Sequence, residues 1–129
     1  MKIIAHGIDL VSLKRISSMV EKHEEHFLAR VYTEKEIAYA GNNKKRIERL
    51  AGRFAAKEAV LKLIGTGLRG KMSWKDIEVV NDDLGRPVVA ISGEVKAVAD
   101  KHGIEQITIS ITHTADLAMA SAVAFTEVL

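Results

Sequence analysis

Five segments of the chain have the mostly apolar or alternating pattern that predicts β-strands. They are residues 2–11, 77–81, 87–91, 107–113 and 117–125. The alternation is clearest where Ile107, Ile109 and Ile111 are separated by polar residues, as in a strand with one buried face. The second and third segments flank Asp82-Asp83-Leu84-Gly85, whose turn residues predict a hairpin.

Four further segments carry helix signals. They are residues 12–23, 34–40, 44–64 and 92–101. Ser12 is a typical N-cap, Thr33 and Glu36 have the spacing of a capping box, and Gly65 directly follows the longest helix as a glycine stop. The resulting order, β-α-α-α-β-β-α-β-β, predicts the α+β class.

Composition excludes several kinds of protein. A chain of 129 residues can bury one core but not two, so we expect a single domain over residues 1–129. The absence of cysteine excludes disulfide scaffolds, thiol nucleophiles and thiolate metal sites. No apolar run approaches the roughly 20 residues of a membrane span, and no signal-peptide pattern is present. We therefore expect a cytoplasmic protein without a membrane partner.

The formal net charge of +2 conceals an uneven distribution. Residues 1–43 are neutral, residues 44–75 carry +8 and residues 76–129 carry −6. Such a basic stretch predicts a polyanionic ligand: phosphates, a nucleic acid or an acidic protein. Its most regular part is a stripe at every fourth position of the long helix, for which a solvated face is the alternative interpretation. The stripe consists of Lys45, Arg49, Arg53 and Lys57.

Two charged residues of the long helix fall on its apolar stripe. The i, i+3, i+4 pattern that begins at Ile47 selects apolar residues until it reaches Glu58 and Lys62. Burying an unpaired charge costs several kcal/mol, so these residues either form an ion pair with each other or line a functional site. Arg53 lies about 180° around the helix from Lys62, so a ligand that touched both would do so from different subunits.

Asp9 is a third charged residue in apolar surroundings. It shares a strand face with Val11 and with Gly7, which we expect to leave open space beside it. The alternative is that Asp9 ends the strand and caps the next helix. Together with Glu58 and Lys62, and without a His or Cys ligand set, Asp9 suits a hard cation such as Mg²⁺ shared with substrate phosphates.

His113 continues the parity of the isoleucines at the end of its strand. It can bond a phosphate or a ribose there, and a half-buried core histidine is the alternative. The glycine motif Gly65-Thr66-Gly67 is not a Walker or Rossmann loop, because it follows a helix instead of preceding one. No Gly-x-Ser-x-Gly elbow or serine triad is apparent either.

Several of these stretches together resemble the holo-[acyl-carrier-protein] synthase family, the small bacterial branch of the 4′-phosphopantetheinyl transferases. The matching stretches are residues 7–11, 50–62, 65–67, 81–87 and 109–114. The run Arg53-Phe54-Ala55-Ala56-Lys57-Glu58-Ala59, combined with the early Gly7-Ile8-Asp9, is highly specific. One position departs from the family pattern, because Ala5 stands where members often have a glycine.

The resemblance implies a single-domain phosphopantetheinyl transferase-like fold, in which an antiparallel sheet packs against a long central helix. It also implies transfer of 4′-phosphopantetheine from coenzyme A to a serine of apo acyl carrier protein, in support of fatty acid biosynthesis. Asp9 and Glu58 would bind Mg²⁺, with Mn²⁺ as the alternative, and Lys62 would contact the pyrophosphate. All three would be catalytic.

The same resemblance implies further contacts. Family members are typically homotrimers with sites between subunits. The acyl carrier protein would dock on Arg15, Met19 and Lys22. The coenzyme A contacts would be Lys44, Lys45, Arg53, Lys62, Gly65, Pro87, His113 and Thr114.

Two other functions compete with the transferase. A nucleic-acid-binding module using residues 44–75 would explain the charge, but the stretch lacks a recognisable motif and interleaved aromatics. A structural interaction protein would use Glu58 and Lys62 only to fix packing. The nucleic-acid-binding module also leaves two carboxylates and a lysine on apolar faces unexplained. We expect the transferase, without a nucleic-acid partner.

Overall fold

The computed structural model describes residues 1–127 and has the predicted order of elements, with one added 3₁₀ turn. The elements are β1 (Lys2–Ser12), α1 (Leu13–Val31), α2 (Glu34–Ala40), α3 (Arg46–Ile64), η1 (Trp74–Asp76), β2 (Ile77–Asn81), β3 (Pro87–Ile91), α4 (Gly93–Lys101), β4 (Gln106–His113) and β5 (Leu117–Thr126). The α+β class is confirmed, as are the capping box of α2 and the left-handed Gly65 after α3.

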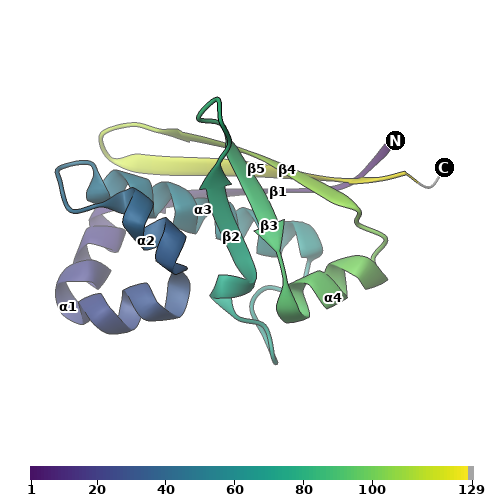
Figure 1. Cartoon of the computed structure of the whole chain (residues 1–129), viewed down its shortest axis with the longest axis horizontal. Coiled ribbons are helices and arrows are strands. Elements are labelled where there is room, and N and C mark those ends of the chain that lie inside the picture. Colours follow the sequence, from purple (N-terminus) through teal and green to yellow (C-terminus); the bar gives the residue numbers. More distant parts are fainter. Residues whose placement is uncertain (128–129) are drawn as a thin grey trace.

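The strands form two antiparallel sheets. β1, β5 and β4 pair in that order, and β2 and β3 form a separate hairpin. The residues of β5 that face α3 are all small, which lets the helix lie close to the sheet. They are Ala118, Ala120, Ala122 and Ala124. Figure 1 shows the helices on one side of the long strands, so α3 lies between the three-stranded sheet and the other elements.

No element within residues 1–127 covers the opposite face of this sheet (Figure 1). Ile8 and Leu10 of β1 remain 54% and 58% exposed, and Leu117 and Met119 of β5 extend the same apolar surface. A large exposed apolar surface on a small protein usually marks a contact with another molecule. We refer to these four residues as the outer sheet face.

Gly7 brings β1 into contact with α3. The expectation of open space beside Gly7 is wrong, because a Cβ at this position would overlap the carbonyl oxygen of Ala59 and lie 2.8 Å from the amide nitrogen of Leu63. Only glycine permits this crossing. Because Asp9 is two residues further along β1, on the same face, the crossing places it beside the part of α3 that carries Glu58.

The first helix is longer than the sequence predicts. The expected end at His23 is a kink, with φ −142° and ψ 37°, after which α1 continues to Val31. The polar run from His23 to His26 interrupts the apolar stripe, and the kink lets Phe27 and Leu28 return to the core. Across residues 1–127, no helix is both long and apolar enough to span a membrane.

A buried ion pair connects α2 with α3. The Nζ atom of Lys57 lies 2.7 Å from Oε1 of Glu36, and both side chains are fully inaccessible to solvent. Glu36 also accepts hydrogen bonds from the amides of Thr33 and Val79, while Lys57 donates to the carbonyl of Ile77. The solvated-face interpretation of the basic stripe is therefore wrong for Lys57, whose charge is neutralised inside the protein.

Candidate active site

The first cluster of functional side chains forms where β1 crosses the second half of α3. The Nζ atom of Lys62 lies 2.9 Å from Oδ1 of Asp9 and donates to the carbonyl of Ile8 at 3.1 Å. The side chain of Asp9 is only 14% exposed, whereas that of Lys62 is half exposed. The structure thus brings Asp9, Glu58 and Lys62 together, although Asp9 is 49 residues away from Glu58 in sequence.

The two carboxylates repel each other across this cluster. Burial, and next the charge of Asp9, raise the pKa of Glu58, while Lys62 and Arg15 act in the opposite direction. The hydrogen bond to Asp9 raises the pKa of Lys62. The i, i+4 ion pair considered from the sequence is not formed, because the ammonium group of Lys62 pairs with Asp9 instead.

The donor set of this cluster fits a hard divalent cation. A cation bound between two carboxylates relieves their mutual repulsion, and oxygen donors suit Mg²⁺. No group of three or more His, Cys, Asp or Glu side chains suited to a metal occurs within residues 1–127. A cation bound by Asp9 and Glu58 would therefore complete its shell with ligand oxygens and water.

The second cluster lines a cavity of about 290 Å³ between the first half of α3, the β2–β3 hairpin and the end of β4. Arg53 is only 5% exposed, so the solvated-face interpretation is wrong for this residue also. Its guanidinium group lies 3.7 Å from the centre of the Tyr39 ring and donates to Oδ1 of Asn81. Within the described chain its Nε atom has no hydrogen-bond partner, and burial lowers its pKa. This cavity therefore holds a buried cation with an unused donor.

His113 lies in the same cavity and is not a core residue. Its side chain is 48% exposed, and its Nδ1 atom lies 3.3 Å from Oε1 of Glu48. The parity argument was correct about the face of β4 that His113 occupies. The ring remains accessible because α3 begins at Arg46, so only the first turn of the helix lies beside it.

Of the other residues predicted to contact the nucleotide, some line the cavity and others lie outside it. Lys45 and Pro87 line the cavity. Lys44 is exposed and lies outside the lining, and Gly65 ends α3 at the other end of the helix. Thr114 organises the β4–β5 turn, where its hydroxyl oxygen accepts hydrogen bonds from two backbone amides.

Several cavity residues were not predicted from the sequence. Tyr39, Asn81, Glu48 and Arg49 line it, yet the first two lie on α2 and at the end of β2, far from Arg53 in sequence. No local pattern links them to Arg53. Glu48 and Arg49 had a usable signal, because they lie five and four residues before Arg53, within the basic stretch.

The two clusters lie on different sides of α3. Arg53 and Lys62 are nine residues apart, which corresponds to about 13 Å along the helix axis and about half a turn around it. Arg53 points toward α2 and the β2–β3 hairpin, whereas Lys62 points toward β1. One chain therefore presents two separate groups of charged residues: a carboxylate cluster (Asp9, Glu58, Lys62) and a cationic cavity (the residues around Arg53).

The predicted docking residues lie on the first part of α1. Arg15, Met19 and Lys22 are all exposed. The guanidinium group of Arg15 lies 5.8 Å from the centre of the Phe54 ring, and its charge also acts on Glu58. The basic part of α1 thus adjoins the carboxylate cluster.

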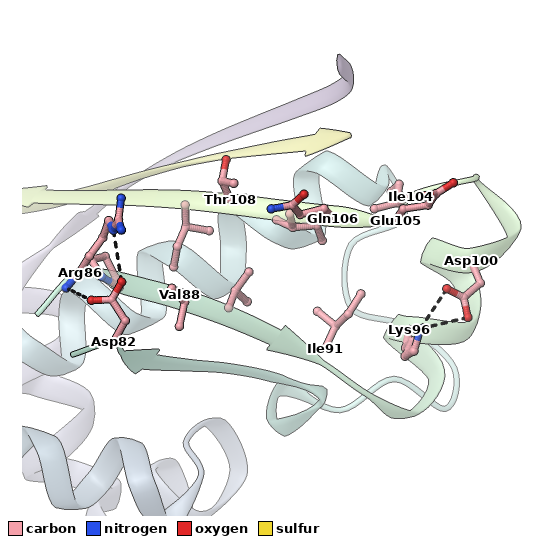
Figure 2. Close-up of a pocket in the computed structure, with 14 residues that line it drawn as sticks. Asp82, Arg86, Val88, Ile91, Lys96, Asp100, Ile104, Glu105, Gln106 and Thr108 are labelled. Carbon is pink, nitrogen blue, oxygen red and sulfur yellow. Dashed lines mark hydrogen bonds and ion pairs between the residues drawn. The ribbon is translucent and has the colours of Figure 1, made fainter. Parts of the chain in front are cut away.

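A larger cavity of about 670 Å³ lies between β3 and β4, beside α4. Figure 2 shows two ion pairs among its lining residues, Arg86 with Asp82 and Lys96 with Asp100. Most of the remaining lining is aliphatic, and none of the carboxylate cluster contributes to it. Both cationic side chains among its described lining residues are thus paired, whereas the smaller cavity holds several cationic side chains.

An α+β fold, a pair of carboxylates suited to a divalent cation and a separate cationic cavity are together typical of an enzyme that transfers a phosphate-containing group. The model of the 4′-phosphopantetheinyl transferase superfamily matches residues 5–122. The chain belongs to this superfamily and, within it, to the holo-[acyl-carrier-protein] synthase family.

Individual relatives agree over nearly the whole length. The chain is 45% identical, over 92% of its own residues and 91% of the relative's, to a holo-[acyl-carrier-protein] synthase of Caldanaerobacter subterraneus subsp. tengcongensis. The crystal structure of the synthase from Neisseria meningitidis is 34% identical and superposes with a TM-score of 0.87, covering 97% of this chain and 100% of that one. The synthase from Bacillus anthracis, in complex with CoA (3′,5′-ADP), gives a TM-score of 0.79 at 37% identity, covering 97% of this chain and 98% of that one.

Proposed function

We propose that this chain transfers the 4′-phosphopantetheine group from coenzyme A to a serine of apo acyl carrier protein. The serine oxygen attacks the β-phosphate, which carries the pantetheine arm, and the bond to the α-phosphate oxygen breaks. The products are holo carrier protein and adenosine 3′,5′-bisphosphate, and the serine proton is released. The observation that carries this proposal is the pairing of an acidic cluster with a separate cationic cavity in a chain of this family.

The carboxylate cluster provides the chemistry at the pyrophosphate. Asp9 and Glu58 would hold Mg²⁺, which supplies neutralisation of phosphate charge when bound. Lys62 is placed to exchange its contact with Asp9 for a phosphate oxygen and to stabilise the leaving phosphate. Asp9 or Glu58, acting through water, accepts the proton of the serine.

The cationic cavity provides affinity for the nucleotide end of coenzyme A. The cationic side chains of Arg53 and Lys45 line this space, and His113 adds a further polar group to it. Charge-assisted hydrogen bonds of this kind are the strong ones in phosphate recognition. Pro87 also lines this cavity, and Lys44, Gly65 and Thr114 remain proposed contacts outside its lining.

We further propose a homotrimer in which the carboxylate cluster of one subunit adjoins the cationic cavity of the next. The opposed directions of these two half-sites and the apolar outer sheet face support this arrangement. An acidic carrier protein would dock on Arg15, Met19 and Lys22, beside the carboxylate cluster. We also propose a cytoplasmic location for the protein.

Chelation tests the proposed metal. Release of adenosine 3′,5′-bisphosphate from coenzyme A, measured by chromatography in the presence of apo carrier protein, is expected to stop when EDTA removes divalent cations. Excess Mg²⁺ or Mn²⁺ should restore it, because both are octahedral oxygen-binding cations. Unchanged release in EDTA would show that Asp9 and Glu58 act without a metal.

Mixed oligomers test the proposed site between subunits. Arg53→Met disables the cationic cavity, and Asp9→Asn with Glu58→Gln disables the carboxylate cluster, so each variant alone should be inactive. Co-expression with different affinity tags should restore about one quarter of wild-type activity, since one interface in four combines two intact half-sites in a random cyclic assembly. Mixed oligomers that remain inactive would place both half-sites of each working unit on one chain.

A further inference from the structure

Glu48 is the one carboxylate among the described residues that line the cationic cavity. A negative charge beside Lys45, Arg49 and Arg53 opposes the binding of phosphates. Glu48 also lies in the first turn of α3, where an acidic residue favours the helix dipole. That effect does not require the side chain to face the cavity, so it leaves the position of the carboxylate unexplained.

The backbone brings Glu48 and His113 together. At Gly52 the helix is so close to β4 that a Cβ would lie 3.1 Å from Cγ2 of Ile111. Glu48 is one helical turn before Gly52, and His113 is two residues after Ile111 on the same strand face. Both steps cover about 6 Å, so the close approach continues from the first pair of residues to the second.

The contact with Glu48 restricts the imidazole ring of His113. Oε1 of Glu48 lies 3.3 Å from Nδ1 of His113. The backbone after His113 is already fixed, because the amide of Thr114 donates to the carbonyl of Leu117 at 2.8 Å. The main motion still open to His113 is then rotation of its side chain. A carboxylate beside Nδ1 favours the tautomer that carries its proton on that atom and leaves Nε2 free for a ligand.

We propose that Glu48 is a positioning residue, which holds His113 with Nδ1 facing its carboxylate and Nε2 available to the phosphorylated nucleotide. In this role Glu48 increases the affinity of the cavity for nucleotide, although its own charge is negative. The proposal rests on the proposed function, in which this cavity binds the nucleotide end of coenzyme A.

The proposal is tested by whether Glu48→Gln weakens or tightens the binding of nucleotide. The probe is adenosine 3′,5′-bisphosphate, titrated calorimetrically into the whole wild-type protein and into the Glu48→Gln variant. Loss of the positioning contact is expected to weaken binding about tenfold, the usual scale of one charge-assisted hydrogen bond. If Glu48 only contributes repulsion, the same change should tighten binding. After His113→Ala, Glu48→Gln should cause no further weakening.

Two controls separate positioning from other effects. Glu34→Gln removes an exposed acid from the first turn of α2, away from the cavity, and should leave the affinity unchanged. Nitrogen NMR of the ligand-free protein should show His113 as the Nδ1–H tautomer in the wild type and as a mixture in Glu48→Gln.

Unchanged or tighter nucleotide binding, or an unchanged His113 tautomer, would overturn the positioning role. A wild-type protein that fails to bind the probe while Glu48 still sets the tautomer would instead overturn the proposed nucleotide site, and with it the purpose given to Glu48.

Discussion

Replacing both carboxylates of the cluster, Asp9→Asn with Glu58→Gln, is expected to lower the rate of phosphopantetheine transfer by about a thousandfold or more. The amides keep the shape of the side chains but cannot hold a divalent cation at the pyrophosphate. The rate is measured as release of adenosine 3′,5′-bisphosphate with saturating apo carrier protein and Mg²⁺.

The same change should not unfold the protein. Burial and the neighbouring Asp9 raise the pKa of Glu58, so its ionised form is disfavoured in the folded state at neutral pH. Glutamine removes this penalty, and the thermal midpoint of Glu58→Gln alone should stay the same or rise.

A structural role for Glu58 predicts the reverse, namely a lower midpoint and no metal-dependent activity to lose. Asp83→Asn with Glu34→Gln removes two exposed acids elsewhere and serves as the matched control.

Lys57→Met is expected to destabilise the fold by about 3–5 kcal/mol, because it leaves the carboxylate of Glu36 buried without its cation. Glu36 has no access to solvent, and its remaining partners are the amides of Thr33 and Val79. Denaturant unfolding measures the loss, and Lys35→Met, at an exposed position of α2, is the control.

Adding Glu36→Gln to Lys57→Met should recover part of this stability. Glutamine removes the unpaired charge and still offers an oxygen to the amide of Val79. If Lys57→Met alone changes stability by no more than the Lys35→Met control, the ion pair does not have the role described for it.

The elements that were correctly predicted have local signals. The capping box at Thr33 and Glu36, the glycine after α3 and the turn residues at Asp82 each fix a boundary within a few residues. The end of α1 was missed because the polar run from His23 to His26 interrupts the apolar stripe, which resumes only at Phe27 and Leu28.

The contacts that were missed join residues distant in sequence. Glu36 and Lys57 lie on different helices, and no pattern around either indicates that both are buried. The close crossing at Gly7 depends in the same way on where α3 lies against β1. Such contacts follow from tertiary packing, which periodicity does not encode.

The carboxylate cluster was accessible to sequence reasoning for a physical reason. Asp9, Glu58 and Lys62 are charged residues on faces that the surrounding pattern marks as apolar, and burying them is costly without a function. The cavity around Arg53 was only partly accessible, because its walls come from α2, the hairpin and β4.

Mass spectrometry of apo acyl carrier protein tests the central claim most directly. The carrier is incubated with this protein, coenzyme A and Mg²⁺, and its intact mass is measured. The account predicts a gain of about 340 Da, the phosphopantetheine group transferred as a phosphoryl ester. It also predicts that the gain disappears with Asp9→Asn and Glu58→Gln. No gain with several carrier proteins, or a gain that persists in the double variant, would contradict it.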